Sequence, residues 1–308
     1  MKEGKRMSVI NVNGLTKDYG SGRGVFDVSF EVNEGEVFGF LGPNGAGKST
    51  TIRHLMGFSK PDGGDCSIFG LDTFKDYDKI LNNVGYIPGE IALPAGLTGT
   101  EFLRMMQDLQ GVHNEERLNY LLDLFQLDPN IETKKMSLGV KRKLAIVSAF
   151  MNDPKVLILD EPTSGLDPVM QEVFIEFIRK EKELCKTILL SSHIFSEVDA
   201  TCDRIAIIKD GHLVSNFIAD ELRHSTSKFY SIYVDKDIDK LKEELKQFKI
   251  VKARKDHITV MINDNEVNKL MSVISKIDVL DFVHHKETLE DYFMKYYKED
   301  KSFEGVKK

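Results

Sequence analysis

The strongest constraint on this chain is a glycine-rich loop that lies between a buried strand and a helix. Residues 36–41 have the apolar character of a short buried strand, and residues 51–56 have the pattern that opens a helix. The loop between them consists of Gly42, Pro43, Asn44, Gly45, Ala46, Gly47, Lys48, Ser49 and Thr50. Strand, glycine-rich loop and helix in this order are the context that a phosphate-binding loop requires.

The composition of this loop suits a triphosphate. Its glycines allow successive backbone N–H groups to point at one anion, and the helix that follows adds about 0.3–2 kcal/mol from its positive end. Charge-assisted N–H bonds contribute about 1.5–3 kcal/mol each. The Lys48 ammonium would contact the outer phosphates, and Ser49 would hold Mg²⁺. A glycine turn beside an unrelated surface lysine is the alternative, which the complete motif in this context disfavours.

Two carboxylates follow the apolar run 156–159. Asp160 and Glu161 stand at the carboxyl end of this predicted strand, the end that faces the nucleotide crevice in parallel α/β sheets. Asp160 is suited to Mg²⁺, and Glu161 to accepting a proton from an attacking water. Two solvent-facing acids at a strand end are the alternative, and the phosphate-binding loop makes this the weaker interpretation.

Three other residues are ambiguous when each is taken alone. Tyr19 lies beside a glycine-rich turn and is able to stack on a base, although a packing role is commoner for such a tyrosine. Ser137 is suited to cap the helix that follows it, and an anion contact at the same helix end is the alternative. His193 follows the predicted strand 187–192 as a lone histidine, which is more often structural than catalytic.

Composition predicts a soluble globular protein of a reducing compartment. The 308 residues allow one large or two ordinary domains, and an apolar fraction of 41% supports a sizeable core. Cys66, Cys185 and Cys202 are widely spaced and odd in number, which indicates free thiols. A net charge of −7 argues against a nucleic-acid partner. The apolar runs are strand-sized, so we expect a second polypeptide to supply any membrane span.

The pattern after the loop predicts a helical insert and a second domain. Residues 98–126 carry apolar side chains at helical spacing behind a capping sequence. Composition changes near residues 224–227, after which we expect strands and helices in βαββαβ order and a closing helix at 289–297. The first predicted domain, residues 1–224, binds the nucleotide and includes a helical subdomain at about 90–152. The second, residues 225–308, is a small, ferredoxin-like α+β domain.

Taken as a set, these residues resemble the motifs of ATP-binding-cassette ATPases, over residues 9–222. Tyr19 matches the adenine-stacking aromatic residue, residues 42–49 match the Walker A motif, and residues 136–140 match the signature loop. Residues 156–161 match Walker B with its base, residues 164–167 match the D-loop, and His193 matches the switch histidine. They occur in the order of the family, so each ambiguous signal is strengthened by the others. The resemblance implies an α/β fold with a P-loop NTPase core, an antiparallel β subdomain and a helical subdomain.

The resemblance also implies ATP and Mg²⁺ as cofactors. Glu161 would polarise the attacking water, His193 would contact the γ-phosphate, and the metal would be held by Ser49 and Asp160. Ser137 and Gly139 would reach ATP bound to a second copy in a head-to-tail dimer. The partner is a second copy of the chain or a different cassette. The D-loop residue Asp167 is carried over as a further nucleotide-binding residue.

Two departures from the family pattern stand out. In the signature loop, Leu138 occupies the place of the first glycine and Val140 that of the glutamine. The Q-loop glutamine expected after residues 86–88 is replaced by Gly89, with Glu90 next. No side-chain amide is therefore present at that position to sense Mg²⁺ and water, and a substitute role for Glu90 stays open.

The segment 288–294 is similar to the tail of exporter ATPases of the bacitracin and daunorubicin type. It implies the ATPase subunit of a bacterial exporter, peripheral to the cytoplasmic face of the membrane and paired with a separately encoded permease. One alternative is a cassette ATPase that acts off the membrane with ribosomes or nucleic acid, and a single cassette without long heptads argues against it. A regulatory subunit without turnover is the other alternative, which the intact catalytic motifs disfavour. The transported substrate stays open.

Overall fold

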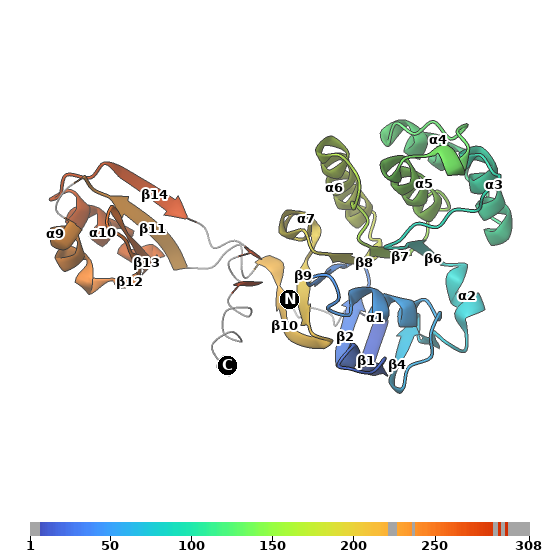
Figure 1. The fold of residues 1–308 in the computed structure, drawn as a ribbon, viewed down its shortest axis with the longest axis horizontal. Helices are drawn as coiled ribbons and strands as arrows, with labels where there is room; N and C mark the ends of the chain where they lie inside the picture. The colour runs from blue at the N-terminus through green and yellow to red at the C-terminus, as the bar shows by residue number, and fades with distance from the viewer. Residues whose placement is uncertain (1–6, 221–226, 236–237, 286–288, 291–292, 295–308) are drawn as a thin grey trace. The chain divides into compact units, whose positions relative to one another are not determined.

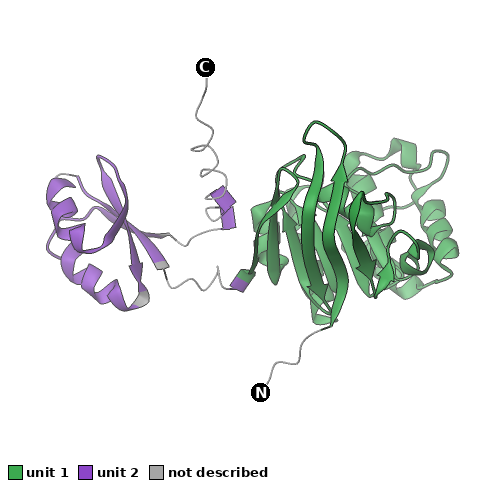
Figure 2. Ribbon diagram, turned by 90° about the horizontal axis from the view of Figure 1, so that it is seen from below, with its two compact units in different colours: residues 1–219 green, residues 220–308 purple. Residues whose placement is uncertain are grey.

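The computed structural model describes residues 7–220, 227–235, 238–285, 289–290 and 293–294 of the chain. These residues belong to two units, Met1–Ala219 and Asp220–Lys308, which Figure 2 distinguishes by colour. The larger unit contains every sequence motif with a predicted chemical role.

The larger unit is built on a central sheet with the strand order β10-β9-β3-β8-β7-β6. Its strands are β3 (Val37–Leu41), β6 (Val84–Ile87), β7 (Val156–Asp160), β8 (Thr187–Ser192), β9 (Arg204–Lys209) and β10 (His212–Ile218). All neighbouring pairs are parallel except β9 with β10, which form a hairpin. Every residue of β3, β7 and β8 is buried, as expected for parallel strands that are covered on both faces.

A second, antiparallel sheet has the strand order β2-β1-β4-β5. Its strands are β1 (Ser8–Asp18), β2 (Gly24–Asn33), β4 (Gly63–Ile68) and β5 (Leu71–Asp72). β1 continues to Asp18, because its pairing with β2 resumes after register shifts. Apolar side chains of the two sheets share one core that includes Val12, Phe30 and Phe40.

The helices of the larger unit surround the central sheet. They are α1 (Lys48–Leu55), α2 (Tyr77–Leu81), α3 (Gly99–Gln110), α4 (Glu115–Leu124), the 3₁₀ turn η1 (Thr133–Lys135), α5 (Leu138–Phe150), α6 (Pro168–Glu183) and α7 (Phe195–Thr201). In Figure 1, α3, α4 and α5 lie together as one group, while α1 packs between the two sheets. The predicted helical insert is therefore present, and the capping box of Thr98 and Glu101 at the start of α3 is confirmed.

The smaller unit has helices on an antiparallel sheet with the strand order β12-β13-β11-β14. In chain order its elements are β11 (Ser227–Tyr233), α9 (Ile238–Glu244), η2 (Leu245–Gln247), β12 (Lys249–Ala253), β13 (His257–Asn263), η3 (Asp264–Glu266), α10 (Val267–Ile274) and β14 (Asp281–His285). Ile232, Leu241 and Val260 belong to its own apolar core. Most of the predicted closing helix, 289–297, lies outside the described residues.

Two bulk features bear on the predictions from composition. Among the described residues, none of Cys66, Cys185 and Cys202 takes part in a disulfide bond. Within the described ranges, no helix combines the length and the apolar character that crossing a membrane needs.

Candidate functional site

The glycine-rich loop connects β3 to α1, and its backbone conformation depends on glycine. Gly47 caps α1 with a φ of 111°, in the left-handed region that favours glycine. At Gly42, a Cβ atom would lie 2.5 Å from the backbone oxygen of Ile208 in β9. The loop therefore follows the sheet edge so closely that larger residues do not fit at these two positions.

Lys48 opens α1 and is held inside the loop. Its side chain is 5% exposed, and Nζ donates hydrogen bonds to the carbonyl oxygens of Gly42 at 2.6 Å and Pro43 at 3.3 Å. The same ammonium lies 3.0 Å from Oε1 of Glu161. These contacts direct the positive charge of the loop toward the carboxyl end of β7.

Asp160 and Glu161 are fixed by β8, the strand beside β7. Asp160 is the last residue of β7, and its Oδ1 accepts a hydrogen bond from the Ser191 hydroxyl at 2.5 Å. The Glu161 backbone N–H donates to the Ser191 carbonyl oxygen at 3.0 Å. Glu161 has a φ of 50°, an uncommon left-handed conformation for a residue with a Cβ. Such local strain is typical of functional sites, and here it coincides with the predicted catalytic base.

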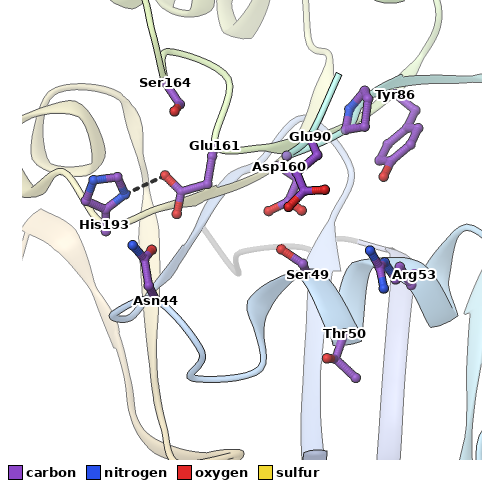
Figure 3. A pocket seen from close by; sticks show the side chains of 12 residues that line it. Asn44, Ser49, Thr50, Arg53, Tyr86, Glu90, Asp160, Glu161, Ser164 and His193 are labelled. Atoms are coloured by element: carbon purple, nitrogen blue, oxygen red, sulfur yellow. Dashed lines mark hydrogen bonds and ion pairs between the residues drawn. The ribbon is translucent and has the colours of Figure 1, made fainter. Parts of the chain in front are cut away.

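His193 follows β8 and contacts Glu161 directly. Its Nδ1 lies 2.7 Å from Oε2 of Glu161, the contact drawn as a dashed line in Figure 3. The imidazole is 47% exposed. The structure therefore links the lysine, the glutamate and the histidine in one continuous chain of contacts, from α1 through β7 to β8.

These side chains surround a cavity of about 370 Å³. Its lining consists of Asn44, Ser49, Thr50, Arg53, Tyr86, Pro88, Gly89, Glu90, Asp160, Glu161, Ser164 and His193. The structure thus brings together six predicted site residues, Asn44, Ser49, Thr50, Asp160, Glu161 and His193. In Figure 3 the Ser49 hydroxyl is directed toward the Asp160 carboxylate.

The donor set at Ser49 and Asp160 fits Mg²⁺ that a nucleotide brings with it. One hydroxyl and one carboxylate face the cavity from opposite walls. Among the described residues, no group of three or more His, Cys, Asp or Glu side chains could hold a metal ion. Mg²⁺ commonly takes one or two protein ligands and fills its other positions with phosphate oxygens and water. These residues therefore fit a metal that binds together with a phosphate ligand.

Other predicted site residues lie outside the cavity lining. Ser137 is the N-cap of α5 and accepts a hydrogen bond from the Val140 backbone N–H at 3.3 Å, as the capping interpretation predicts. Asp167 is the N-cap of α6. Tyr19 follows β1 and is 54% exposed. A Cβ at Gly139 would lie 2.9 Å from the Gly165 carbonyl oxygen, so the start of α5 packs closely on the turn before α6.

Arg142, which belongs to none of the sequence motifs, connects three parts of the site. This side chain of α5 is 2% exposed, and its guanidinium donates to the carbonyl oxygens of Ser164 at 2.9 Å, Pro88 at 2.9 Å and Gly89 at 2.8 Å. Burial lowers the pKa of Arg142, and the charges of Asp160 and Glu161 oppose that effect. A signal was present in the sequence, because residue 142 lies on the same helical face as the apolar residues 145, 146 and 149.

Gly89 occupies the Q-loop position and lies against the predicted metal ligand. A Cβ at this residue would lie 2.9 Å from Oδ2 of Asp160, closer than side chains normally approach. Nearby, burial and the charge of Asp160 raise the pKa of Tyr86 to about 12, so the phenol stays neutral at physiological pH. Glu90 also lines the cavity, and its side chain is exposed.

Comparison with protein families places these residues in a known sequence context. The family model described as ABC transporter matches residues 25–164, which include the loop, the start of α5 and the two carboxylates. The bacitracin transport ATP-binding protein BcrA of Bacillus licheniformis is 35% identical over 305 residues, covering 94% of this chain and 97% of that protein. The daunorubicin/doxorubicin resistance ATP-binding protein DrrA of Streptomyces peucetius is 38% identical over 221 residues, covering 70% and 67%.

Solved structures give the same result for the fold. An ATP-binding subunit of an ABC transporter aligns with a TM-score of 0.65 at 33% identity, covering 70% of this chain and 92% of that one. The ATP-binding cassette MJ0796, solved as a dimer in a post-hydrolysis state with ADP and phosphate, aligns with a TM-score of 0.62 at 24% identity. It covers 68% of this chain and 98% of its own, and at this identity it supports the fold alone.

Proposed function

The chain belongs to the ABC transporter family, and on this premise we propose that it binds and hydrolyses Mg·ATP as the ATPase subunit of a bacterial exporter. The observation that carries the proposal is the chain of contacts from Lys48 through Glu161 to His193, at 3.0 and 2.7 Å. Glu161 and His193 line one cavity. A phosphate-binding cation beside a carboxylate that can deprotonate the attacking water suits ATP hydrolysis.

In this proposal, the loop and Lys48 bind the phosphates. The backbone N–H groups at the start of α1 and the buried ammonium form a cationic concavity for the outer phosphates. Ser49 and Asp160 would hold Mg²⁺, which supplies neutralisation of charge on the phosphate oxygens when it is bound.

In this proposal, Glu161 and His193 carry out the proton transfer. The Glu161 carboxylate takes a proton from the attacking water as general base. The imidazole of His193, 2.7 Å away, holds one carboxylate oxygen in place. The other edge of the imidazole ring lines the cavity, where it can contact the γ-phosphate. The ion pair with Lys48 orients the other oxygen.

We also propose that two cassettes complete each site. Ser137 and Gly139 begin α5 outside the lining of the cavity, a placement that suits contacts to ATP bound by a second subunit. MJ0796, which shares the fold, was itself solved as a dimer. The second cassette is another copy of the chain or a different one, and ATP binding closes the pair while hydrolysis opens it.

The proposed setting is the cytoplasmic face of the membrane, with a separately encoded permease as partner. The names of the bacitracin and daunorubicin relatives support an export role. The smaller unit, whose strand order is β12-β13-β11-β14, is proposed to be a ferredoxin-like accessory domain.

Purification from native membranes tests this setting. A tagged chain extracted in mild detergent should carry an integral membrane protein with it and release phosphate from ATP only when Mg²⁺ is present. Repeated recovery with ribosomes would overturn the export role. ATP binding without phosphate release in the presence of the permease would favour a regulatory subunit instead.

A further inference from the structure

A buried glutamate lies directly behind the contact between Glu161 and His193. Glu197 belongs to the first turn of α7, and its side chain is 2% exposed. Its Oε2 accepts a hydrogen bond from the Ser192 hydroxyl at 2.5 Å, and the Ser192 oxygen in turn accepts one from the Ile194 backbone N–H at 3.0 Å. These bonds bracket His193, which lies between the serine and the isoleucine in the chain.

The same carboxyl group reaches the turn after β7. Thr163, a residue that is 2% exposed, lies close enough to Glu197 for its hydroxyl to lower the pKa of that carboxyl group. Thr163 is the second residue after Glu161, and Ser192 directly precedes His193. One carboxyl group therefore bonds to the segment that carries the histidine and lies next to the segment that carries the base.

Burial shifts the ionisation of this carboxyl group into the neutral pH range. Desolvation, together with the charge of Glu161, raises the pKa of Glu197 to about 7 despite the opposing effects of Ser192 and Thr163. Among the described residues, Oε1 of Glu197 is buried without a hydrogen-bond partner. A buried carboxylate with an unpaired oxygen is costly, so the neutral form is favoured in this place.

The other elements packed on α7 add little charge near this group. β3 consists of Val37, Phe38, Gly39, Phe40 and Leu41, without an ionisable side chain. From α6, Arg179 donates to the Ala200 carbonyl oxygen, near the opposite end of α7. His193 follows β8 and pairs with Glu161. Glu161 is thus the acidic neighbour whose charge acts on Glu197.

We propose that Glu197 is a positioning residue for hydrolysis, whose neutral carboxyl group, between Thr163 and Ser192, aligns Glu161 with His193. This inference rests on the proposed ATPase function. Ionisation of Glu197 would place a second negative charge behind Glu161 and weaken that alignment. The reaction would then slow on the alkaline side without a matching loss of nucleotide affinity.

The experiment compares steady-state ATP hydrolysis between pH 6 and pH 8.5 in the wild-type chain, Glu197→Gln and Glu197→Ala. The amide of Glu197→Gln copies the shape of the neutral carboxyl group, so kcat should stay within about threefold of the wild type and lose the part of the alkaline decline that Glu197 causes. Glu197→Ala should lower kcat about tenfold or more, with the KM for ATP changed less than about threefold. Glu181→Gln is the matched control, because Glu181 is also 2% exposed but pairs with Arg117, away from the cavity.

The control should keep the pH profile of the wild type. A Glu197→Gln profile that coincides with the wild-type profile across the range would overturn the proposal, as would a wild-type kcat in folded Glu197→Ala. If Glu197→Ala does not fold, the Glu197→Gln profile decides alone. A wild-type chain without any ATP hydrolysis would contradict the proposed function itself, which separates the two failures.

Discussion

The ammonium of Lys48 lies 3.0 Å from Oε1 of Glu161, so the lysine of the phosphate-binding loop and the proposed base form a direct ion pair. The two side chains are 5% and 16% exposed. Removing one partner of a largely buried pair is costly, because the other charge stays buried without compensation. Substitutions at either residue should therefore alter both phosphate binding and the environment of the base.

Replacing Lys48 should weaken nucleotide binding strongly. The ammonium donates to Gly42 and Pro43 and supplies the one side-chain cation of the loop, so Lys48→Ala loses both the loop contacts and the charge that phosphate would meet. A charge-assisted hydrogen bond contributes about 1.5–3 kcal/mol, which corresponds to a roughly 10- to 100-fold rise in Kd for ATP.

A fluorescent ATP analogue titrated into each variant measures this change. Lys75→Ala is the control, since Lys75 is 78% exposed and pairs with Asp72 at the surface. Unchanged affinity in Lys48→Ala would mean that the loop does not bind phosphate in the way proposed.

Restoring a glutamine at the Q-loop position should harm the site instead of improving it. Any Cβ at Gly89 would lie 2.9 Å from Oδ2 of Asp160, so both Gly89→Gln and Gly89→Ala should displace the proposed metal ligand. We expect the Mg²⁺ concentration for half-maximal hydrolysis to rise about tenfold in both variants.

Gly63→Ala is the control for that measurement, because a Cβ there would meet its nearest atom at 3.6 Å. An increase in turnover in Gly89→Gln, relative to the wild type, would show that the glutamine of the family is tolerated here and that the close approach to Asp160 relaxes.

Replacing Arg142 should destabilise the larger unit. Its guanidinium serves the carbonyl oxygens of Pro88, Gly89 and Ser164 from a side chain that is 2% exposed, and Arg142→Met leaves these three acceptors without that donor. Each unsatisfied buried group costs about 1–3 kcal/mol, so the free energy of unfolding should fall by about 3 kcal/mol or more. Chemical denaturation followed by circular dichroism measures it.

The neighbouring Lys143→Met change controls for loss of a positive charge on α5, since Lys143 is only partly buried. Equal stability of the Arg142→Met and Lys143→Met variants would contradict the role assigned to the guanidinium.

The free energy of unfolding should change with pH as Glu197 ionises. Its pKa rises from 4.5 to about 7 on folding, so the folded state binds the proton more tightly than the unfolded chain does. Its stabilising contribution is therefore complete below about pH 4.5 and is lost as the pH rises through about 7, a change of about 3 kcal/mol.

Unfolding free energies of the wild type and Glu197→Gln, measured between pH 5 and pH 8, test this sign. The wild type should lose stability relative to the variant as the pH rises. Parallel curves, or a relative gain by the wild type, would show that the carboxyl group is not held in its neutral form.

The sequence predicted the local elements of the site well, because each depends on short-range chemistry. Glycines before Lys48 indicate a phosphate-binding loop, and an apolar run ending in Asp160 and Glu161 indicates a buried strand with acids at its end. The capping residues Thr98 and Ser137 were likewise identifiable from their neighbours, and the structure places both at helix N-termini.

Contacts between distant segments could not be predicted from the sequence. Glu197 lies 34 residues after Thr163 along the chain, and its partner Ser192 comes from a strand whose pairing is set by the whole sheet. The full length of β1 likewise depends on its pairing with β2, which resumes after a register shift. Such features depend on tertiary packing, which overrides local patterns.

The most direct test of the central claim is the mass of Glu161→Gln in the presence of Mg·ATP, measured by sedimentation velocity together with phosphate release. If Glu161 is the base of a site shared by two cassettes, this variant should bind ATP, release phosphate at least about a hundredfold more slowly than the wild type, and shift from a 35.0 kDa monomer to a dimer of twice that mass. A Glu161→Gln chain that stays monomeric with ATP bound and hydrolyses it at the wild-type rate would contradict both the base and the shared site.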